Sequence, residues 1–258
     1  MAQNAKKTLD RVLSRAGVCS RTEARAAILA GRASVNGRTV RDPDAWVDLV
    51  RDKLLFDGGP LRAVQKQVWM LHKPTGYVTT ADDEHGRDTV YALLPQDLPW
   101  LAPVGRLDQD TSGLLLFTND SDLAHAITDP ATKLPKTYVV GCKGQLADDA
   151  LQQLAAGVQL DDGPTRQAQV RRLQQDERST TIELTITEGR NRQVRRMVQA
   201  VGSRVQTLHR VRVGPLRLGD EPVGTARRLT GAEVDALRAA VRPDRRPPRP
   251  RTNRGTSR

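Results

Sequence analysis

Two aspartates, Asp108 and Asp110, stand in a polar segment between two apolar stretches, within Gly105–Gly113. Carboxylates placed between buried segments cost free energy unless they are paired or serve a chemical purpose. An ionised aspartate can act as a nucleophile or accept a proton as a general base. The segment is therefore the candidate reactive part of the chain. Its structural alternative is an ordinary Asx turn that ends in a required glycine.

A metal site is a second interpretation of the same segment. Asp108–Thr111, with its Asp-x-Asp-Thr order, resembles the start of the active site in haloacid-dehalogenase-type phosphatases. That family has a continuous apolar strand before the first aspartate, and Gly105 and Arg106 interrupt it here. A later acidic pair would also be needed, and Asp161-Asp162 could supply it. A magnesium-dependent phosphatase with a basic RNA-binding region therefore stays open as an alternative.

Basic side chains gather further along, in Glu188–Met197. We expect Asn191 to cap a helix that ends near Gly202, with apolar residues at helical spacing on one face. The opposite face then carries Arg192, Arg195, Arg196 and Gln199. These side chains could contact phosphates or stabilise a carboxylate in a pocket.

The elements that hold these residues are mixed. Trp69–Leu71, Val104–Leu107 and Leu114–Phe117 read as strands, and Thr181–Thr187 alternates strictly between apolar and polar residues. Strands and long helices do not alternate regularly, which favours an α+β class with a largely antiparallel sheet flanked by helices.

The first 58 residues read as a separate small unit of two helices and a hairpin. Ser20 and Glu23 form a capping box, and Asn36-Gly37 is a strong hairpin signal. Four arginines lie in pairs on the two helix faces, and their planar groups suit phosphate contacts better than lysine does. The pairs are Arg11 with Arg15 and Arg21 with Arg25.

Charge is distributed unevenly over the 258 residues, whose formal net charge is +11. Residues 1–58 hold 11 Lys/Arg against 7 Asp/Glu, residues 59–241 hold 23 against 22, and residues 242–258 hold 7 against 1. Cations at both ends of a nearly neutral centre favour a polyanionic partner. The Arg/Pro-rich stretch 242–258 is predicted to be a disordered basic tail.

Several classes of protein are disfavoured by composition. No apolar run exceeds five residues, so a membrane span is excluded and no apolar leader is visible at the start. Two cysteines far apart and four scattered histidines give neither a disulfide framework nor a metal cluster. No glycine loop for a nucleotide cofactor is present. We expect a cytoplasmic protein without a metal or organic cofactor.

The small unit resembles the RNA-binding module named after ribosomal small-subunit protein four. The resemblance rests on Leu9–Gly17, Cys19–Ala24 and Gly31–Arg38, with its V-N-G hairpin. It implies binding to structured RNA and adds Arg32 to the expected RNA contacts.

The larger unit resembles the RsuA family of RNA pseudouridine synthases. Four motifs follow in the family's order, although His72 replaces the usual asparagine of the first one. They are Leu71–Tyr77, Gly105–Asp120, Lys136–Tyr138 and Glu188–Met197. The resemblance spans about residues 8–237 and implies isomerisation of uridine to pseudouridine after base flipping.

The resemblance also implies roles for individual residues. Asp108 matches the essential aspartate, Arg195 the arginine that keeps it ionised, and Tyr138 the tyrosine that stacks on the target base. Arg106 matches an RNA contact near the flipped nucleotide. Arg192 and Arg196 are expected phosphate contacts, and Lys73, in the first motif, has either a phosphate contact or a structural role.

The resulting prediction is a site-specific ribosomal RNA pseudouridine synthase. We expect an RNA-binding domain at 1–58, a linker at 59–66, a catalytic domain at 67–241 and the tail at 242–258. Large-subunit RNA is favoured over small-subunit RNA, and the substrate is naked RNA or a pre-ribosomal particle bound by a monomer. An RNA-binding assembly factor without catalysis is the alternative from another class.

Overall fold

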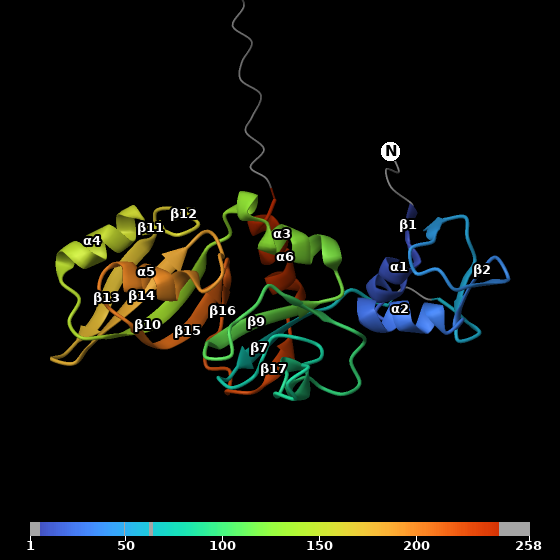
Figure 1. Cartoon of the computed structure of the whole chain (residues 1–258), viewed down its shortest axis with the longest axis horizontal. Helices are drawn as coiled ribbons and strands as arrows, with labels where there is room; N and C mark the ends of the chain where they lie inside the picture. The colour runs from blue at the N-terminus through green and yellow to red at the C-terminus, as the bar shows by residue number, and fades with distance from the viewer. Residues whose placement is uncertain (1–5, 49, 62–63, 243–258) are drawn as a thin grey trace, which may run out of the picture.

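The computed structural model describes residues 6–48, 50–61 and 64–242. Its N-terminal unit packs two helices against short strands, seen at one end of the molecule in Figure 1. The elements are β1 (Lys6–Thr8), α1 (Leu9–Arg15), α2 (Arg21–Leu29), β2 (Ala33–Val35), β3 (Arg38–Val40), β4 (Trp46–Asp48), β5 (Leu54–Phe56) and β6 (Gly59–Pro60). The predicted tail lies outside the described residues except for Arg242.

Local sequence explains much of this unit. Ser20 and Glu23 form the predicted capping box at the start of α2. The β2–β3 hairpin turns through Asn36 and Gly37, whose φ angles of 51° and 80° are those that Asn-Gly favours. One boundary differs from the prediction. Gly59 and Pro60 pair with β5, so the small sheet continues past residue 58 into the predicted linker.

The larger unit contains a nine-stranded sheet, a separate pair of short strands, and helices. Its strands are β7 (Val68–Lys73), β8 (Ala102–Val104), β9 (Ser112–Thr118), β10 (Lys136–Lys143), β11 (Gln159–Leu160), β12 (Gly163–Pro164), β13 (Gln169–Gln175), β14 (Ser179–Ile186), β15 (Val205–Val213), β16 (Leu216–Arg217) and β17 (Ala226–Arg228). Its helices are η1 (Val90–Leu93), α3 (Ser121–Thr128), η2 (Pro130–Thr132), α4 (Asp148–Ala156), α5 (Gln193–Ala200) and α6 (Gly231–Ala240).

The main path of this sheet runs β13-β14-β10-β15-β9-β7-β17. Every pair in it is antiparallel except β15 with β9, where His209 and Arg210 lie opposite Ser112 and Gly113. The predicted α+β class with a largely antiparallel sheet is therefore confirmed. The parallel pair places the end of the reactive segment directly beside β15.

Helices cover both faces of the sheet. Leu115 and Phe117 of β9 belong to the core beneath α4 and α5, whereas Leu114 and Leu116 belong to the core beneath α3 and α6. A strand buried on both sides is expected to be continuously apolar, which explains the Leu-Leu-Leu-Phe run. In Figure 1 the two helix pairs lie over different parts of the sheet.

The strand predicted at Val104–Leu107 lies earlier in the chain, at Ala102–Val104, so only Val104 was placed correctly. It ends at Val104, because Gly105 adopts a φ of +73° and turns the chain out of the sheet. The residues that follow form the loop that carries Asp108. Among the described residues, no helix has the length and apolar character needed to cross a membrane.

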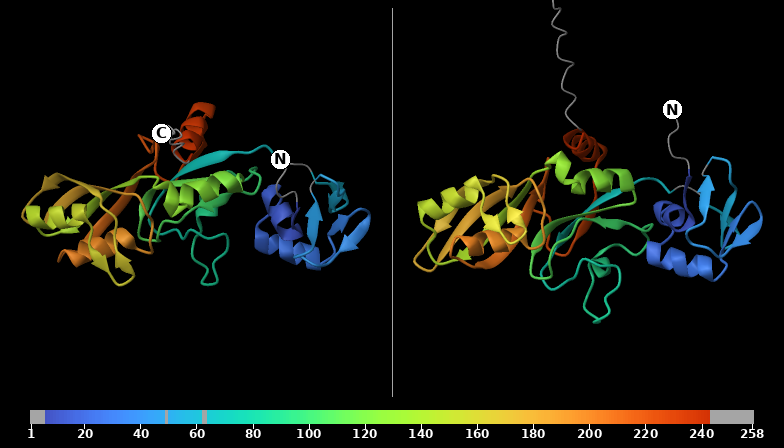
Figure 2. Two further views of the ribbon diagram at one scale, coloured as in Figure 1. Left: turned by 90° about the horizontal axis from the view of Figure 1, so that it is seen from above. Right: turned by 45° about the horizontal axis from the view of Figure 1, so that its top comes forward.

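The two units contact each other beside η1. The N–H of Trp100 donates to the carbonyl oxygen of Gly17 at 3.0 Å, and Arg15 lies 3.5 Å from Asp122 of α3. Trp100 stacks on Tyr91 with ring centroids 4.9 Å apart. Figure 2 shows the N-terminal unit at the side of the larger one, away from α4 and α5.

Candidate active site

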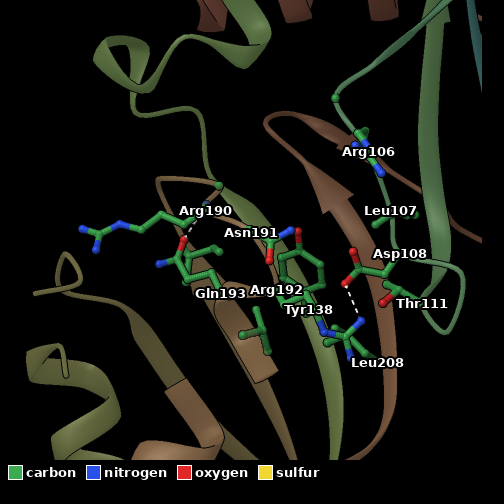
Figure 3. A pocket seen from close by; sticks show the side chains of 14 residues that line it. Arg106, Leu107, Asp108, Thr111, Tyr138, Arg190, Asn191, Arg192, Gln193 and Leu208 are labelled. Atoms are coloured by element: carbon green, nitrogen blue, oxygen red, sulfur yellow. Dashed lines mark hydrogen bonds and ion pairs between the residues drawn. The ribbon is translucent and has the colours of Figure 1, made fainter. Parts of the chain in front are cut away.

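A cavity of about 360 Å³ opens where the loop after β8 faces β10, β15 and the start of α5. Figure 3 shows the side chains that line it. They come from four separate parts of the chain: Gly105, Arg106, Leu107, Asp108, Thr111, Tyr138, Ile186, Gly189, Arg190, Asn191, Arg192, Gln193, Val194 and Leu208. The fold thus brings together three of the four motifs that sequence analysis identified.

The loop that carries Asp108 is held by the last residue of β7 and by the segment that follows it. Lys73 Nζ donates to the carbonyl oxygens of Asp108 at 3.1 Å and Thr111 at 2.8 Å. Thr79 Oγ1 donates to the carbonyl oxygen of Leu107 at 2.7 Å. These bonds restrict the backbone on both sides of Asp108, so its carboxylate is presented to the cavity by a fixed loop.

Lys73 is consequently not an RNA contact. Its side chain has no solvent exposure, and its ammonium group is used by three carbonyl oxygens, including that of Pro74 at 3.0 Å. Burial lowers the pKa of Lys73 to about 8, although the charges of Asp108 and Asp110 act in the opposite direction. The burial of Lys73 contradicts the predicted phosphate contact and supports the structural role.

The far side of the loop rests on β15. Ser112 Oγ lies 2.8 Å from His209 Nδ1. At Gly113 the φ angle is +109°, and an added Cβ would lie 2.3 Å from the carbonyl oxygen of Arg210. Only glycine permits this approach. The glycine that sequence analysis placed at the end of an Asx turn is thus required by packing between β9 and β15.

Asp108 forms an ion pair with Arg192. Its Oδ2 lies 3.5 Å from Arg192 Nη1, as Figure 3 shows, and about a third of its side chain is exposed. Sequence analysis assigned this pairing to Arg195. Arg195 instead bonds to the loop two residues further on, with Nη2 2.9 Å from the carbonyl oxygen of Asp110 and 3.3 Å from Thr111 Oγ1. The prediction that Arg195 pairs with Asp108 was therefore wrong, because the partner is Arg192, three residues earlier.

The start of α5 explains the difference. Asn191 does not cap this helix; the N-cap is Arg192, in a left-handed conformation with φ of 46°, and the helix begins at Gln193. Arg192 therefore lies before the first helical turn, where its side chain reaches Asp108. Gln193 is fixed by Glu188, since its Nε2 donates to Glu188 Oε1 at 2.6 Å and its Oε1 accepts from the N–H of Arg190.

Arg192 also links the two aspartates of the loop. Its Nη2 lies 3.1 Å from Asp110 Oδ2, and Arg195 Nη2 lies 3.1 Å from Asp110 Oδ1. Burial alone would raise the pKa of Asp110, but its bonds and charge interactions with Arg192 and Arg195 lower it overall. Asp110 is thereby held as an anion between the two arginines; Arg192 lines the cavity that contains Asp108, and Arg195 is not among its lining residues.

Tyr138 is nearly buried, with 8 % exposure, and lies in β10 opposite Arg210 of β15. It lines the same cavity as Asp108, as Figure 3 shows. A planar ring in the wall of a cavity that also contains a carboxylate can stack on a flat base. The structure thus brings Tyr138 together with Asp108, while stacking on a base stays a prediction.

The other predicted RNA contacts of the larger unit differ in whether they already bond to a carboxylate. Arg106 is exposed at the cavity rim. Arg196 is engaged with Asp162 through two bonds, of 2.8 and 3.1 Å. That arrangement directs the Asp162 carboxylate toward arginines. Within the described residues, no group of three His, Cys, Asp or Glu side chains is placed to hold a metal ion.

In the N-terminal unit, four of the five predicted RNA contacts already pair with a carboxylate. Arg21 and Arg25 both bond to the buried Asp10, at 2.7 and 3.1 Å. Arg15 lies against Asp122, and Arg32 bonds to Asp57. Of these five arginines, only Arg11 has no ion pair with a carboxylate of the described residues.

The pairing of Arg21 and Arg25 has a structural reason. Asp10 lies at the start of α1 with no solvent exposure. Burial would raise its pKa, but hydrogen bonds from Thr8, Arg21, Arg25 and the N–H of Arg11 lower it to about 2. Arg21 and Arg25 thus join α1 to α2 in addition to any contact with RNA.

Sequence analysis did not single out several lining residues. Thr111 and Gln193 are buried and anchor polar groups, and Leu208 contributes an apolar wall from β15. Their spacing carries no periodic signal of a site, because each comes from a different element. Only the strand order of the sheet places them around Asp108.

Comparison with known sequences assigns both units. The sequence profile described as RNA pseudouridylate synthase matches residues 67–200, and that of the S4 domain matches residues 7–48.

Similar proteins extend over both units. Ribosomal large subunit pseudouridine synthase B of Bacillus subtilis is 39% identical over 233 residues, which cover 90% of this chain and 95% of that protein. An uncharacterized RNA pseudouridine synthase of Aquifex aeolicus is 37% identical over 90% of this chain and 94% of its own length. A crystal structure of a pseudouridylate synthase superimposes with a TM-score of 0.65 at 32% identity, covering 89% of this chain and 99% of that one.

Proposed function

Because this chain belongs to the RNA pseudouridylate synthase family, we propose that it isomerises a specific uridine of ribosomal RNA, with the large subunit as the source of that RNA. The observation that carries the proposal is the cavity in which the Asp108–Arg192 pair and Tyr138 meet. Support for the large subunit comes from the similar protein of Bacillus subtilis, which aligns over both units.

The reaction breaks the bond between uracil N1 and the ribose, turns the base and rejoins it to the ribose through C5. Asp108 provides the ionised carboxylate, either as a nucleophile or as the base that removes a proton from the sugar. Arg192 stabilises its negative charge, and the loop anchored by Lys73 keeps it in place. Tyr138 supports the extruded base in the cavity. Since no electron or group is transferred from outside, no cofactor is required.

The proposal also covers the oligomeric state, the cellular compartment and the form of the RNA substrate. We propose that the enzyme works as a monomer in the cytoplasm and acts on ribosomal RNA either free or in a pre-ribosomal particle. The S4 domain contributes RNA affinity, and Arg11 is exposed and available to contact a phosphate.

The first test follows tritium at C5 of uridine. Ribosomal RNA transcripts that carry this label are incubated in a chelator with the wild type and with Asp108→Asn. We expect the wild type to release tritium into water and the variant to release none, because the new bond to C5 expels that hydrogen. The variant should bind RNA within about tenfold of the wild type, since its side chain keeps its shape.

Two outcomes would contradict the proposal. Magnesium-stimulated release of phosphate from a generic ester, without tritium release from RNA, would point to the phosphatase. Absence of tritium release by the wild type, on large-subunit and small-subunit RNA and on ribosomal particles, would favour the RNA-binding assembly factor instead.

A further inference from the structure

A second cavity, of about 190 Å³, lies behind the active-site wall. It shares Gly105, Arg106, Tyr138, Gly189 and Arg190 with the cavity that contains Asp108. The two spaces are thus adjacent, with Tyr138 between them. Four of the fourteen residues that line this second cavity are cationic: Arg106, Lys136, Arg190 and Arg210.

Lys136 and Arg210 are the cations that belong to this cavity alone. Arg210 of β15 lies opposite Tyr138, and Lys136 precedes Tyr138 by two residues in β10, with a register shift of the β10–β15 pair between them. Arg210 is 4 % exposed, and Lys136 is half-buried. Both side chains line this one cavity, so a buried and a half-buried positive charge face the same space.

Neither charge is neutralised by the protein. In the described residues, Arg210 bonds through Nε to the carbonyl oxygen of Leu114 at 2.7 Å, and Lys136 Nζ bonds to the carbonyl oxygen of Leu134 at 3.2 Å. No carboxylate of that part of the chain is within ion-pair distance of either. The Nη groups of Arg210 have no hydrogen-bond partner there.

The one carboxylate in the lining is already used. Glu188 Oε1 accepts from the N–H of Arg166 at 3.0 Å and from Gln193 Nε2 at 2.6 Å. Its Oε2 lies 3.4 Å from Arg190 Nη2. Glu188 therefore supports the start of α5 and pairs with Arg190, which leaves Arg106, Lys136 and Arg210 facing the cavity without a carboxylate partner among the described residues.

This arrangement favours an incoming anion. Burial, and then the charge of Arg210, lowers the pKa of Lys136 to about 8. An anion between the two cations would offset their mutual repulsion and supply the negative partner that neither has among the described residues. Phosphate oxygens are strong acceptors for guanidinium and ammonium groups.

We propose that this cavity binds a phosphodiester group of the RNA strand next to the target uridine, through Lys136 and Arg210. The proposal rests on the proposed function, since the phosphate arrives with the base that enters the neighbouring cavity. With the backbone gripped on one side of Tyr138 and the base on the other, the two sites together hold the nucleotide in its extruded form.

The test compares Lys136→Met with Lys133→Met, a matched change at an exposed lysine three residues away. Binding to large-subunit ribosomal RNA transcripts is measured across a range of salt concentrations. Lys136→Met should bind about tenfold or more weakly, as expected for a lost bond to a charged group. The slope of log affinity against log salt should fall by about 0.7, the value for one phosphate of a single strand. Lys133→Met should match the wild type.

Thermal unfolding without RNA separates this role from a structural one. Because Lys136 has no carboxylate partner among the described residues, its replacement by Met should leave the melting temperature equal to or above that of the wild type. Lys136→Arg keeps the charge and should restore binding. A lower melting temperature together with unchanged RNA affinity would overturn the proposal and make Lys136 structural.

Inorganic phosphate distinguishes the source of the anion. If millimolar phosphate raises the melting temperature of the wild type but not of Lys136→Met, while RNA affinity is equal in both, the cavity serves free phosphate and the proposal is wrong. Tritium release by the wild type is followed in parallel. Its absence would count against the proposed function, whereas weaker RNA binding by Lys136→Met would still support the phosphate site.

Discussion

At the scale of single residues, Arg192 and Arg195 contact different atoms of the loop that carries Asp108. Arg192 pairs with the carboxylate of Asp108, and Arg195 bonds to the backbone of Asp110. Arg192 holds its position through a left-handed backbone that arginine adopts at a cost of about 1–2 kcal/mol. A strained conformation that places a guanidinium on the reactive carboxylate fits a function in the reaction.

Arg192→Gln therefore should slow the reaction severely. Removing a positioned donor beside developing charge typically lowers the rate by about a hundredfold or more. We expect this loss in tritium release at saturating RNA, with partial recovery in Arg192→Lys. Arg171→Gln, on the edge strand β13, is the matched control and should be as active as the wild type. Equal rates for Arg192→Gln and Arg171→Gln would exclude Arg192 from the chemistry.

At the scale of elements, the reactive loop is held by neighbours on two sides. The end of β7 and the segment that follows it contribute Lys73 and Thr79, and β15 contributes His209 and the backbone of Arg210. The parallel pairing of β9 with β15 sets this second contact. Asp108 is thus positioned by strand order and not by its own loop sequence alone.

Gly113→Ala tests the contact between β9 and β15. The new methyl group would overlap the carbonyl oxygen of Arg210, so the strands must separate. Gly144→Ala is the control, because Gly144 also has a positive φ, of +77°, but has open space around it. Gly144→Ala should lower the free energy of unfolding by about 1–2 kcal/mol, because of its backbone conformation alone. Gly113→Ala should lower it by about 3 kcal/mol or more. Urea unfolding measures both, and equal losses would show that the β9–β15 contact is not tight.

At the scale of the whole molecule, the two units contribute separately. Every residue that lines the cavity around Asp108 lies between Gly105 and Leu208, outside the N-terminal unit. That unit contacts the larger one through Gly17 and Arg15. Their partners, Trp100 and Asp122, are not among the residues that line this cavity. The exposed Arg15–Asp122 pair adds at most about 1 kcal/mol to this contact.

A chain that begins at Val64 should therefore keep its chemistry and lose affinity. Removal of the S4 domain takes away cations that contact RNA, so the dissociation constant for ribosomal RNA should rise about tenfold or more at moderate salt. The turnover rate at saturating RNA should stay within about threefold of the full chain. Tritium release across RNA concentrations measures both values. Loss of turnover at saturation would mean that the N-terminal unit helps to build the active site.

Several elements of this protein could be predicted from short stretches of sequence, because each is stabilised by contacts between residues that are close in the chain. The Ser20–Glu23 capping box, the Asn36-Gly37 hairpin and the alternation in β14 appear as predicted, since each depends on neighbours a few residues away. The family followed from four ordered motifs. The α+β class followed from the spacing of the strands and helices.

Tertiary structure decided which side chains meet. Whether Arg192 or Arg195 reaches Asp108 depends on the residue at which α5 begins, and Glu188 and Gln193 set that start. The burial of Lys73 and the placement of Lys136 and Arg210 at one cavity depend on strand order and register. Periodicity in one segment cannot report distances between segments far apart in the chain, and these contacts are made across such distances.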